Sequence, residues 1–136
     1  MDRGKSAAVV LVLENPYALF ESPAKKAAPL KPLNVDLGGL GIRGMTWDAE
    51  RKGVWIVAGR SADPDIPVDH VSSSVWFWEP DNAGRPPRKT LDLKGFESLE
   101  GVSLLDRSGK PGLLLINDDG GKSKESRYLW MPIPKP

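Results

Sequence analysis

The sequence predicts an all-β protein, and three observations support that fold class. Gly and Pro are frequent, with 14 and 13 residues among 136, which favours many turns over long helices. Apolar residues gather in short runs, and no stretch has the periodicity of an amphipathic helix. Parts of the chain also repeat one another. Because 40% of the residues are apolar, we expect one single domain with a packed core over residues 1–136.

The first two expected strands are separated by a proline-containing loop. The Val- and Leu-rich segment Ala8–Glu14 stops just before Pro16, and a proline cannot donate a hydrogen bond to a strand ladder. Residues Tyr17–Lys31 are expected to form an ordered loop, which could include a helical turn. Leu33–Leu37 is the second expected strand and ends at a Gly-Gly pair.

Seven further strands are expected, each bounded by turn residues such as Gly, Pro, Asp and Asn. They span Gly41–Asp48, Gly53–Gly59, Ser74–Glu79, Thr90–Leu93, Leu99–Leu105, Gly112–Asn117 and Arg127–Met131. The strand Gly53–Gly59 has apolar residues at successive positions, which indicates burial on both faces of a sheet. The proline-rich residues 132–136 are expected to form a polyproline-like tail.

An internal repeat indicates the architecture. In its clearest part, two six-residue segments share the order apolar, charged, Gly, apolar, hydroxyl, apolar. The matched pairs are Ile42–Trp47 with Leu99–Leu104, Gly53–Val57 with Gly112–Ile116, Val75–Trp78 with Arg127–Trp130, and Val35–Leu37 with Leu91–Leu93. Four-stranded antiparallel units with a period of roughly 40 to 60 residues are typical of a β-propeller. In this alignment Trp78 and Trp130 are equivalent, so both indoles are expected in equivalent layers between sheets.

The expected strands divide the chain into parts of successive propeller blades. Residues 8–37 are expected to be the last strands of a preceding blade, residues 38–93 a complete blade, and residues 94–131 an incomplete blade. The chain is thus predicted to be a partial β-propeller of about two four-stranded antiparallel blades. Because propellers typically have 4 to 8 blades, three arrangements stay open: missing blades elsewhere in a longer protein, self-association of several copies into one ring, or an open stack of sheets.

Short motifs resemble a bacterial protein family. Gly39–Gly44 followed by Val57–Gly59, and then Leu99–Val102 followed by Asn117–Gly120, are similar in order and spacing to the domain-of-unknown-function 3616 family. The resemblance extends over nearly the whole chain and corresponds to the C-terminal portion of that family's longer domain. It implies a β-propeller related to the esterase-like phytases, and hence a phytase-like hydrolase activity, that of a metal-dependent phosphoesterase.

Arg43 and Glu100 are the first ligand-binding candidates, because each directly precedes the repeat glycine of its unit. The planar guanidinium of Arg43 could bind phosphate, and the carboxylate of Glu100 could bind a metal ion. Alternatively the two residues form a charge pair that fixes neighbouring blades, since charges withdrawn from water need partners. We expect both side chains at the same end of neighbouring parallel strands.

Asp118 and Asp119 are the second pair of candidates. Two carboxylates with nearby carbonyls suit a hard cation such as calcium, although the segment lacks the acidic residues at alternate positions of a calcium loop. A plain turn is the alternative, because Asp and Gly are preferred turn residues. The histidine His70 lies among acidic residues in the loop 60–74, where a solvated loop is the alternative to a hydrolytic cluster. No catalytic residue is assigned, and no cofactor is expected, with calcium as the alternative.

Composition narrows the function classes. Nineteen basic and eighteen acidic residues leave a net charge of +1, so neither nucleic acid nor a membrane surface is expected as a partner. The lack of cysteine excludes disulfides and thiolate metal sites. There is no clear signal peptide, which makes a cytoplasmic location the default expectation. The leading hypothesis is a binding or scaffold module, with the phosphoesterase as the alternative; whether the chain is an enzyme stays open.

Overall fold

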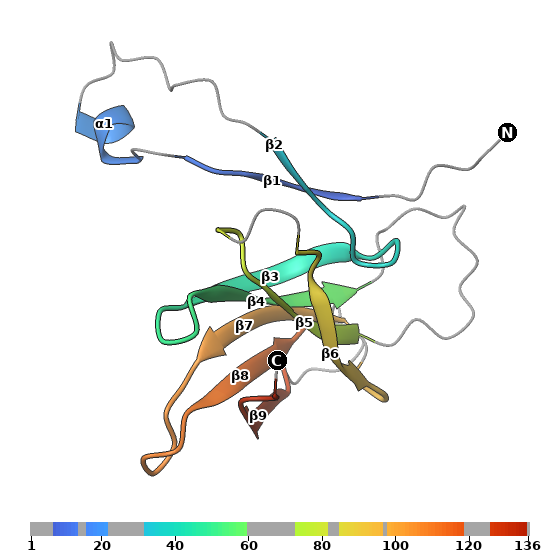
Figure 1. Ribbon diagram of the computed structural model, residues 1–136. Coiled ribbons are helices and arrows are strands. Elements are labelled where there is room, and N and C mark those ends of the chain that lie inside the picture. The colour runs from blue at the N-terminus through green and yellow to red at the C-terminus, as the bar shows by residue number, and fades with distance from the viewer. Residues whose placement is uncertain are drawn as a thin grey trace, which may run out of the picture.

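The described strands form three antiparallel sheets in this computed structural model (Figure 1). The structure describes residues 7–13, 16–21, 32–59, 73–81, 85–96, 98–118 and 126–135. The elements are β1 (Ala8–Leu11), α1 (Pro16–Glu21), β2 (Pro32–Val35), β3 (Gly41–Asp48), β4 (Gly53–Gly59), β5 (Ser73–Trp78), β6 (Arg88–Leu93), β7 (Leu99–Leu104), β8 (Gly112–Asn117) and β9 (Tyr128–Pro132). The prediction of an all-β fold is confirmed.

Each sheet consists of strands that follow one another along the chain. The strand orders are β1-β2, β3-β4-β5-β6 and β7-β8-β9, so the described strands form open sheets that do not close into a ring. One detail extends the expectation of a helical turn, and a second differs from what was expected. Residues Pro16–Glu21 form a short helix, with a proline at the first helical position, where its missing N–H is not needed. Pro132 is the last residue of β9 rather than the start of a tail, and Ile133 packs against the core.

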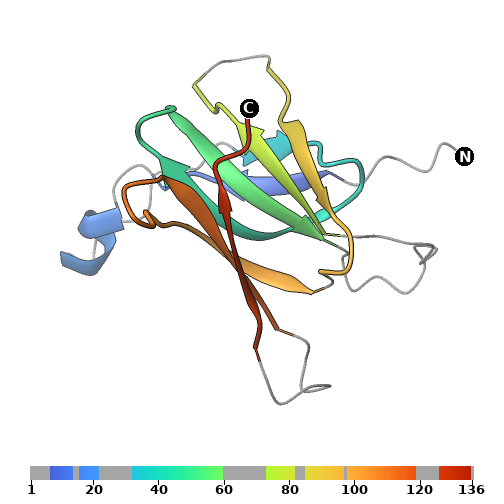
Figure 2. The same cartoon turned by 90° about the horizontal axis from the view of Figure 1, so that it is seen from below.

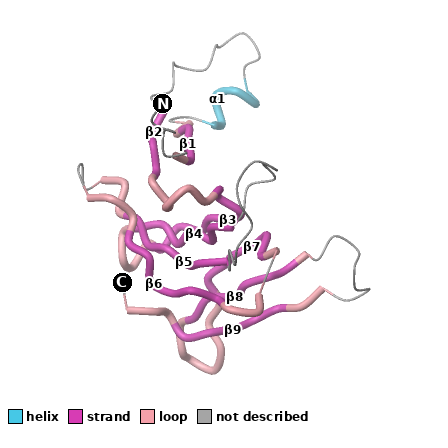
Figure 3. The backbone as a smooth tube through the Cα atoms, turned by 90° about the vertical axis from the view of Figure 1, so that its right-hand side faces the viewer, coloured by secondary structure: helices cyan, strands magenta, loops and turns pink. Residues whose placement is uncertain are grey.

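The sheets stack as three layers, with the four-stranded sheet in the middle (Figure 3). One core lies between the first and second sheets and consists of Val35, Leu37, Ile56 and Ala58. The larger core lies between the second and third sheets and consists of Trp55, Val57, Val75, Phe77, Leu93, Leu99, Leu113 and Leu115. The middle sheet is therefore buried on both faces, as the apolar run in β4 predicted.

The second and third sheets are built in the same register. Gly44 lies opposite Val57 in the β3–β4 pair, and Gly101 lies opposite Ile116 in the β7–β8 pair. In both pairs the register shifts by one residue immediately before that glycine. β3 and β7 lie side by side and run in the same direction (Figure 1). The sequence repeat of the first two strands is therefore a repeat of backbone structure.

The third strands, β5 and β9, correspond one residue away from the predicted alignment. Trp78 packs into the core between the first and second sheets. The structural counterpart of Trp130 is Phe77, because the Phe77 ring covers Gly53 in the same way that the Trp130 indole covers Gly112. The expectation that Trp78 and Trp130 occupy equivalent layers is therefore wrong, since a shift of one residue moves a strand side chain to the opposite face.

Candidate functional site

Arg43 and Glu100 lie together where the second and third sheets meet. Each is the extra residue at the register shift of its strand, β3 or β7, and such bulges redirect the side chain they contain. The Arg43 Nη1 atom lies 3.6 Å from the Glu100 Oε1 atom, with the two side chains 32% and 44% exposed. Both residues therefore lie at the same end of neighbouring parallel strands, as expected.

This arrangement favours the charge-pair interpretation of the two residues. An anion approaching the Arg43 guanidinium meets the Glu100 carboxylate beside it, and a cation approaching Glu100 meets the guanidinium. Since both side chains are partly solvated, the pair contributes less than about 1 kcal/mol to stability. Its main consequence is geometric, because it joins β3 to β7 across the boundary between two sheets.

Asp118, the third candidate, lies at the junction where β7, β8 and β9 begin or end. Its backbone N–H donates to the carbonyl of Ser98 at 3.0 Å. The preceding residue, Asn117, is buried, and its backbone N–H donates to the Arg127 carbonyl at 3.0 Å. These bonds fix the strand ends, which agrees with a turn role for this segment. The fourth candidate, Asp119, lies outside the described residues, as does His70.

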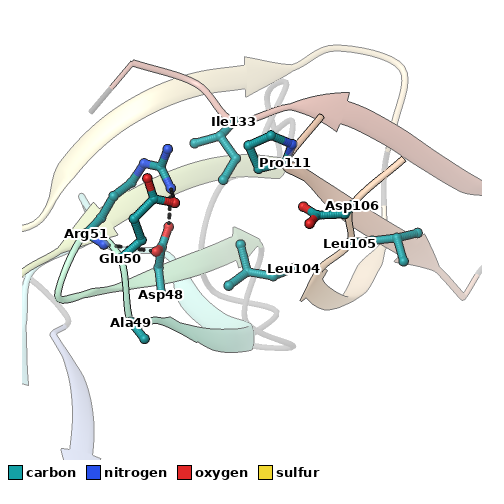
Figure 4. A pocket seen from close by; sticks show the side chains of 9 residues that line it. All are labelled: Asp48, Ala49, Glu50, Arg51, Leu104, Leu105, Asp106, Pro111 and Ile133. Atoms are coloured by element: carbon teal, nitrogen blue, oxygen red, sulfur yellow. Dashed lines mark hydrogen bonds and ion pairs between the residues drawn. The ribbon is translucent and has the colours of Figure 1, made fainter. Parts of the chain in front are cut away.

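A shallow pocket of about 420 Å³ opens where the turn after β3 faces the hairpin after β7 (Figure 4). The sequence interpretation did not find it, because the two segments meet only when the sheets stack. The lining residues are Asp48, Ala49, Glu50, Arg51, Leu104, Leu105, Asp106, Pro111 and Ile133. Carboxylates and apolar side chains thus share one surface.

Asp48 is the buried charge at the back of this pocket. Its Oδ2 atom accepts hydrogen bonds from Trp55 Nε1 at 2.9 Å and from Arg51 Nη1 at 3.1 Å, and its Oδ1 atom accepts from the Arg51 backbone N–H at 3.0 Å. Burial alone raises the pKa of Asp48, but these hydrogen bonds and the charge of Arg51 together lower that pKa below its ordinary value. Asp48 is therefore an ionised anchor for the turn.

The third sheet has an outer face, which points away from the second sheet and carries exposed apolar side chains. We define it by Leu114, Ile116, Tyr128 and Trp130. Ile116 is 45% and Tyr128 is 74% exposed. Their counterparts in the second sheet, by strand register, are Trp55, Val57, Val75 and Phe77. All four counterparts are at most 3% exposed, because the third sheet covers them.

Trp130 is held in place on this outer face. Its Nε1 atom donates to the Leu105 carbonyl at 3.0 Å, and the Arg107 guanidinium lies 5.8 Å from the centre of its ring system. The indole therefore keeps its polar atom satisfied and presents apolar surface outward. The sequence interpretation expected Trp130 on this side of its unit, and the layer it assigned wrongly is that of Trp78, which faces the first sheet.

No family model, curated protein or solved structure matches the chain. The family resemblance of the sequence stays a prediction. Within the described ranges, no group of three or more His, Cys, Asp or Glu residues is placed to hold a metal ion. No helix in the described part of the chain is long and apolar enough to cross a membrane.

Proposed function

We propose that the chain is a binding or scaffold module, built as a partial β-propeller of about two four-stranded blades. The observation that supports this best is the outer face of the third sheet. The residues of this face occupy the same strand positions as those of a fully covered face in the second sheet. Tyr128 on the outer face is 74% exposed, whereas its counterpart in the second sheet, Val75, is buried. An apolar sheet face of this kind marks a surface that binds a partner.

The propeller architecture is supported by three properties of the stack. The second and third sheets share one register, their first strands β3 and β7 run parallel, and each of the three layers buries a face on the next. The blade boundaries at 8–37, 38–93 and 94–131 agree with the division into sheets of two, four and three strands. The resemblance to the domain-of-unknown-function 3616 family belongs to the same proposal.

The partner that fits the outer face is a further sheet with an aliphatic face. The second sheet is covered in this way by Leu113 and Leu115 of the third. In a solution of the isolated chain, a second copy can supply such a face, because Val9 and Leu11 on the first sheet are 57% and 62% exposed. Head-to-tail contact between unlike surfaces gives rings or open filaments.

The phosphoesterase alternative depends on the family resemblance and on the carboxylates of Glu100, Asp118 and Asp119. Glu100 is paired with Arg43, and Asp118 takes part in the strand junction, so neither position adds an argument for hydrolysis. Calcium-dependent release of phosphate from a generic phosphate ester would favour this alternative over the scaffold role.

Light scattering at increasing protein concentration tests the proposal. We expect the average mass to rise with concentration and the rise to be strongly reduced by Tyr128→Asp, which places a charge on the outer face. Tyr17→Asp is the matched control, because Tyr17 on α1 is also 74% exposed. A monomer at every concentration, or an equal effect of the two substitutions, would contradict the proposal.

A further inference from the structure

The edge strand β9 has the position in its sheet that β5 has in the second sheet. Tyr128 corresponds to Val75, and Trp130 corresponds to Phe77. In the second sheet, β6 pairs with β5 as the fourth strand, with Leu91 opposite Val75. In the third sheet, β8 is the only described strand that pairs with β9 (Figure 2, in which β9 is dark red). The edge of β9 opposite β8 therefore corresponds to the edge of β5 that pairs with the fourth strand, β6.

The backbone of β9 directs hydrogen-bonding groups toward that edge. The Arg127 carbonyl accepts from the Asn117 N–H, and the Ile133 N–H donates to the Pro111 carbonyl, so both groups point toward β8 and the segment that precedes it. The N–H and C=O groups of one residue in an antiparallel strand share a side, and successive residues alternate. The N–H and C=O groups of Tyr128 and Trp130 therefore point to the open edge.

The second sheet shows the same backbone direction at the counterpart position. The Val75 carbonyl faces β6 and also accepts a hydrogen bond from Thr90 Oγ1 at 2.9 Å. Strand pairing there runs from Ser73 to Phe77. By register, a strand on β9 would pair with residues 126–130 and end before Pro132, which has no N–H to offer.

Two strands of this chain, β2 at the edge of the first sheet and β6 at the edge of the second, share one pattern at their ends. β2 runs into Val35-Asp36-Leu37, and β6 ends in Leu91-Asp92-Leu93. Ala8 lies opposite Val35 just as Val75 lies opposite Leu91. The apolar residues of both patterns pack into the core between sheets. A strand that completes the third sheet should have the same apolar, Asp, apolar ending.

We propose that the open edge of β9 binds an extended segment of another polypeptide, which adds as an antiparallel fourth strand and ends in an apolar–Asp–apolar pattern. Main-chain hydrogen bonds to Tyr128 and Trp130 provide the attachment. The apolar residue opposite Tyr128 provides selectivity through a cross-strand pair. The main-chain attachment depends on the strand register and not on what covers the outer face.

A labelled peptide with the sequence of residues 85–94, which contains β6, tests this inference. Fluorescence anisotropy with the full chain, below the concentration at which it self-associates, should show saturable binding to one site. The same peptide with aspartate in place of both Leu91 and Leu93 should bind about tenfold more weakly, because two apolar contacts are lost. Absence of saturable binding by the unchanged peptide would overturn the inference.

Two matched pairs of variants locate the site. N-methylation of Leu91 in the peptide removes an N–H that faces β9, whereas N-methylation of Asp92 changes an N–H that faces away. The first should weaken binding roughly fivefold more than the second, which corresponds to one net hydrogen bond. In the protein, Tyr128→Pro removes the edge N–H without breaking the β8–β9 ladder, and Tyr128→Ala is its control.

Equal effects within the peptide pair would overturn the edge inference even if Tyr128→Pro fails to fold, because that pair leaves the protein unchanged. The result is also independent of the proposed module function. Peptide binding without any concentration-dependent rise in mass would support the edge site and contradict the outer-face proposal. A rise in mass without peptide binding would do the reverse.

Discussion

A Cβ atom on Gly44 would lie 3.2 Å from the Cα of Gly101. The backbones of β3 and β7 are therefore so close at this point that an added Cβ would force one of them to shift by a few tenths of an ångström. Gly44 and Gly101 occupy the same position in two consecutive units. Only a Cβ on Gly44 would point into the close contact between β3 and β7. A Cβ on Gly101 would meet only the Ile116 Cβ, at 3.9 Å, because it points away from the second sheet toward the open side of the stack.

Alanine substitutions at these two glycines should therefore have unequal effects. Gly44→Ala should lower the free energy of unfolding by about 1–3 kcal/mol, since the added methyl group forces β3 and β7 apart. Gly101→Ala should cost clearly less, because 3.9 Å is an ordinary contact distance. Urea denaturation of the two variants measures the difference. Equal losses would mean that both glycines lie under a neighbouring strand.

Acid should destabilise the chain through Asp48. The pKa of this carboxyl is lowered in the folded state from its ordinary value of 3.8. Its contribution to stability is therefore complete above the unfolded-state value and is lost as the pH falls through the folded-state pKa. Thermal melts between neutral pH and about pH 2 should show this loss in the parent chain, and Asp48→Asn should reduce the pH dependence. The same acid sensitivity in Asp48→Asn would assign it to other carboxylates.

Removal of the Asp48 carboxylate should also lower the free energy of unfolding at neutral pH. Asp48→Ala leaves the Trp55 indole N–H without the acceptor it has at 2.9 Å, and Trp55 is fully buried. We expect a loss of roughly 1–3 kcal/mol for that unsatisfied donor. Glu50→Ala is a suitable control in the same turn, because the Glu50 side chain is 77% exposed. Chemical denaturation at neutral pH compares the two variants.

Trp78 should contribute more to stability than Trp130. Trp78 packs against the core between the first and second sheets, whereas Trp130 lies on the outer face. Replacing a fully buried tryptophan with alanine costs roughly 3–5 kcal/mol. Trp78 and Trp130 are both partly buried, so we expect both losses to fall below that range, with Trp78→Ala the more costly. Differential scanning calorimetry of the two variants provides the comparison. A negligible loss for Trp78→Ala would contradict the assigned layer.

The Arg43–Glu100 pair should show a small, salt-sensitive coupling. A double-mutant cycle with Arg43→Ala and Glu100→Ala should give an interaction energy below about 1 kcal/mol, because the charges are 3.6 Å apart and partly solvated. The coupling should decrease further at 1 M salt. A coupling that persists at high salt would indicate a desolvated pair and a tighter boundary between β3 and β7.

The strands, and the contact between Arg43 and Glu100, could be predicted from the sequence. Turn residues bound every strand, and the charged position before the repeat glycine placed Arg43 and Glu100 in equivalent positions. The third-strand alignment failed because Trp78 and Trp130 match in side-chain type, while the face is determined by register against Gly53 and Gly112. The helix α1 has only six residues, too few for a helical period to be visible.

The pocket and the Asp48 network were not predictable from one sequence. Asp48 accepts from Trp55, seven positions further along the chain, and nothing in the local pattern distinguishes this aspartate from an ordinary turn residue. The pocket wall formed by Leu104 and Pro111 belongs to another sheet. Only the stacking of the sheets brings these segments together.

The central claim is that the third sheet repeats the register of the second and that its outer face is exposed to solvent in the monomer. Hydroxyl-radical footprinting at a series of protein concentrations tests this claim most directly. Tyr128 reports on that face, and Trp55 reports on the register-equivalent face of the second sheet, where it is fully buried. We predict strong labelling of Tyr128 in dilute protein, progressive protection of Tyr128 as the chain associates, and protection of Trp55 at every concentration. Protection of Tyr128 in dilute monomer, or labelling of Trp55 comparable to that of Tyr128, would contradict the account.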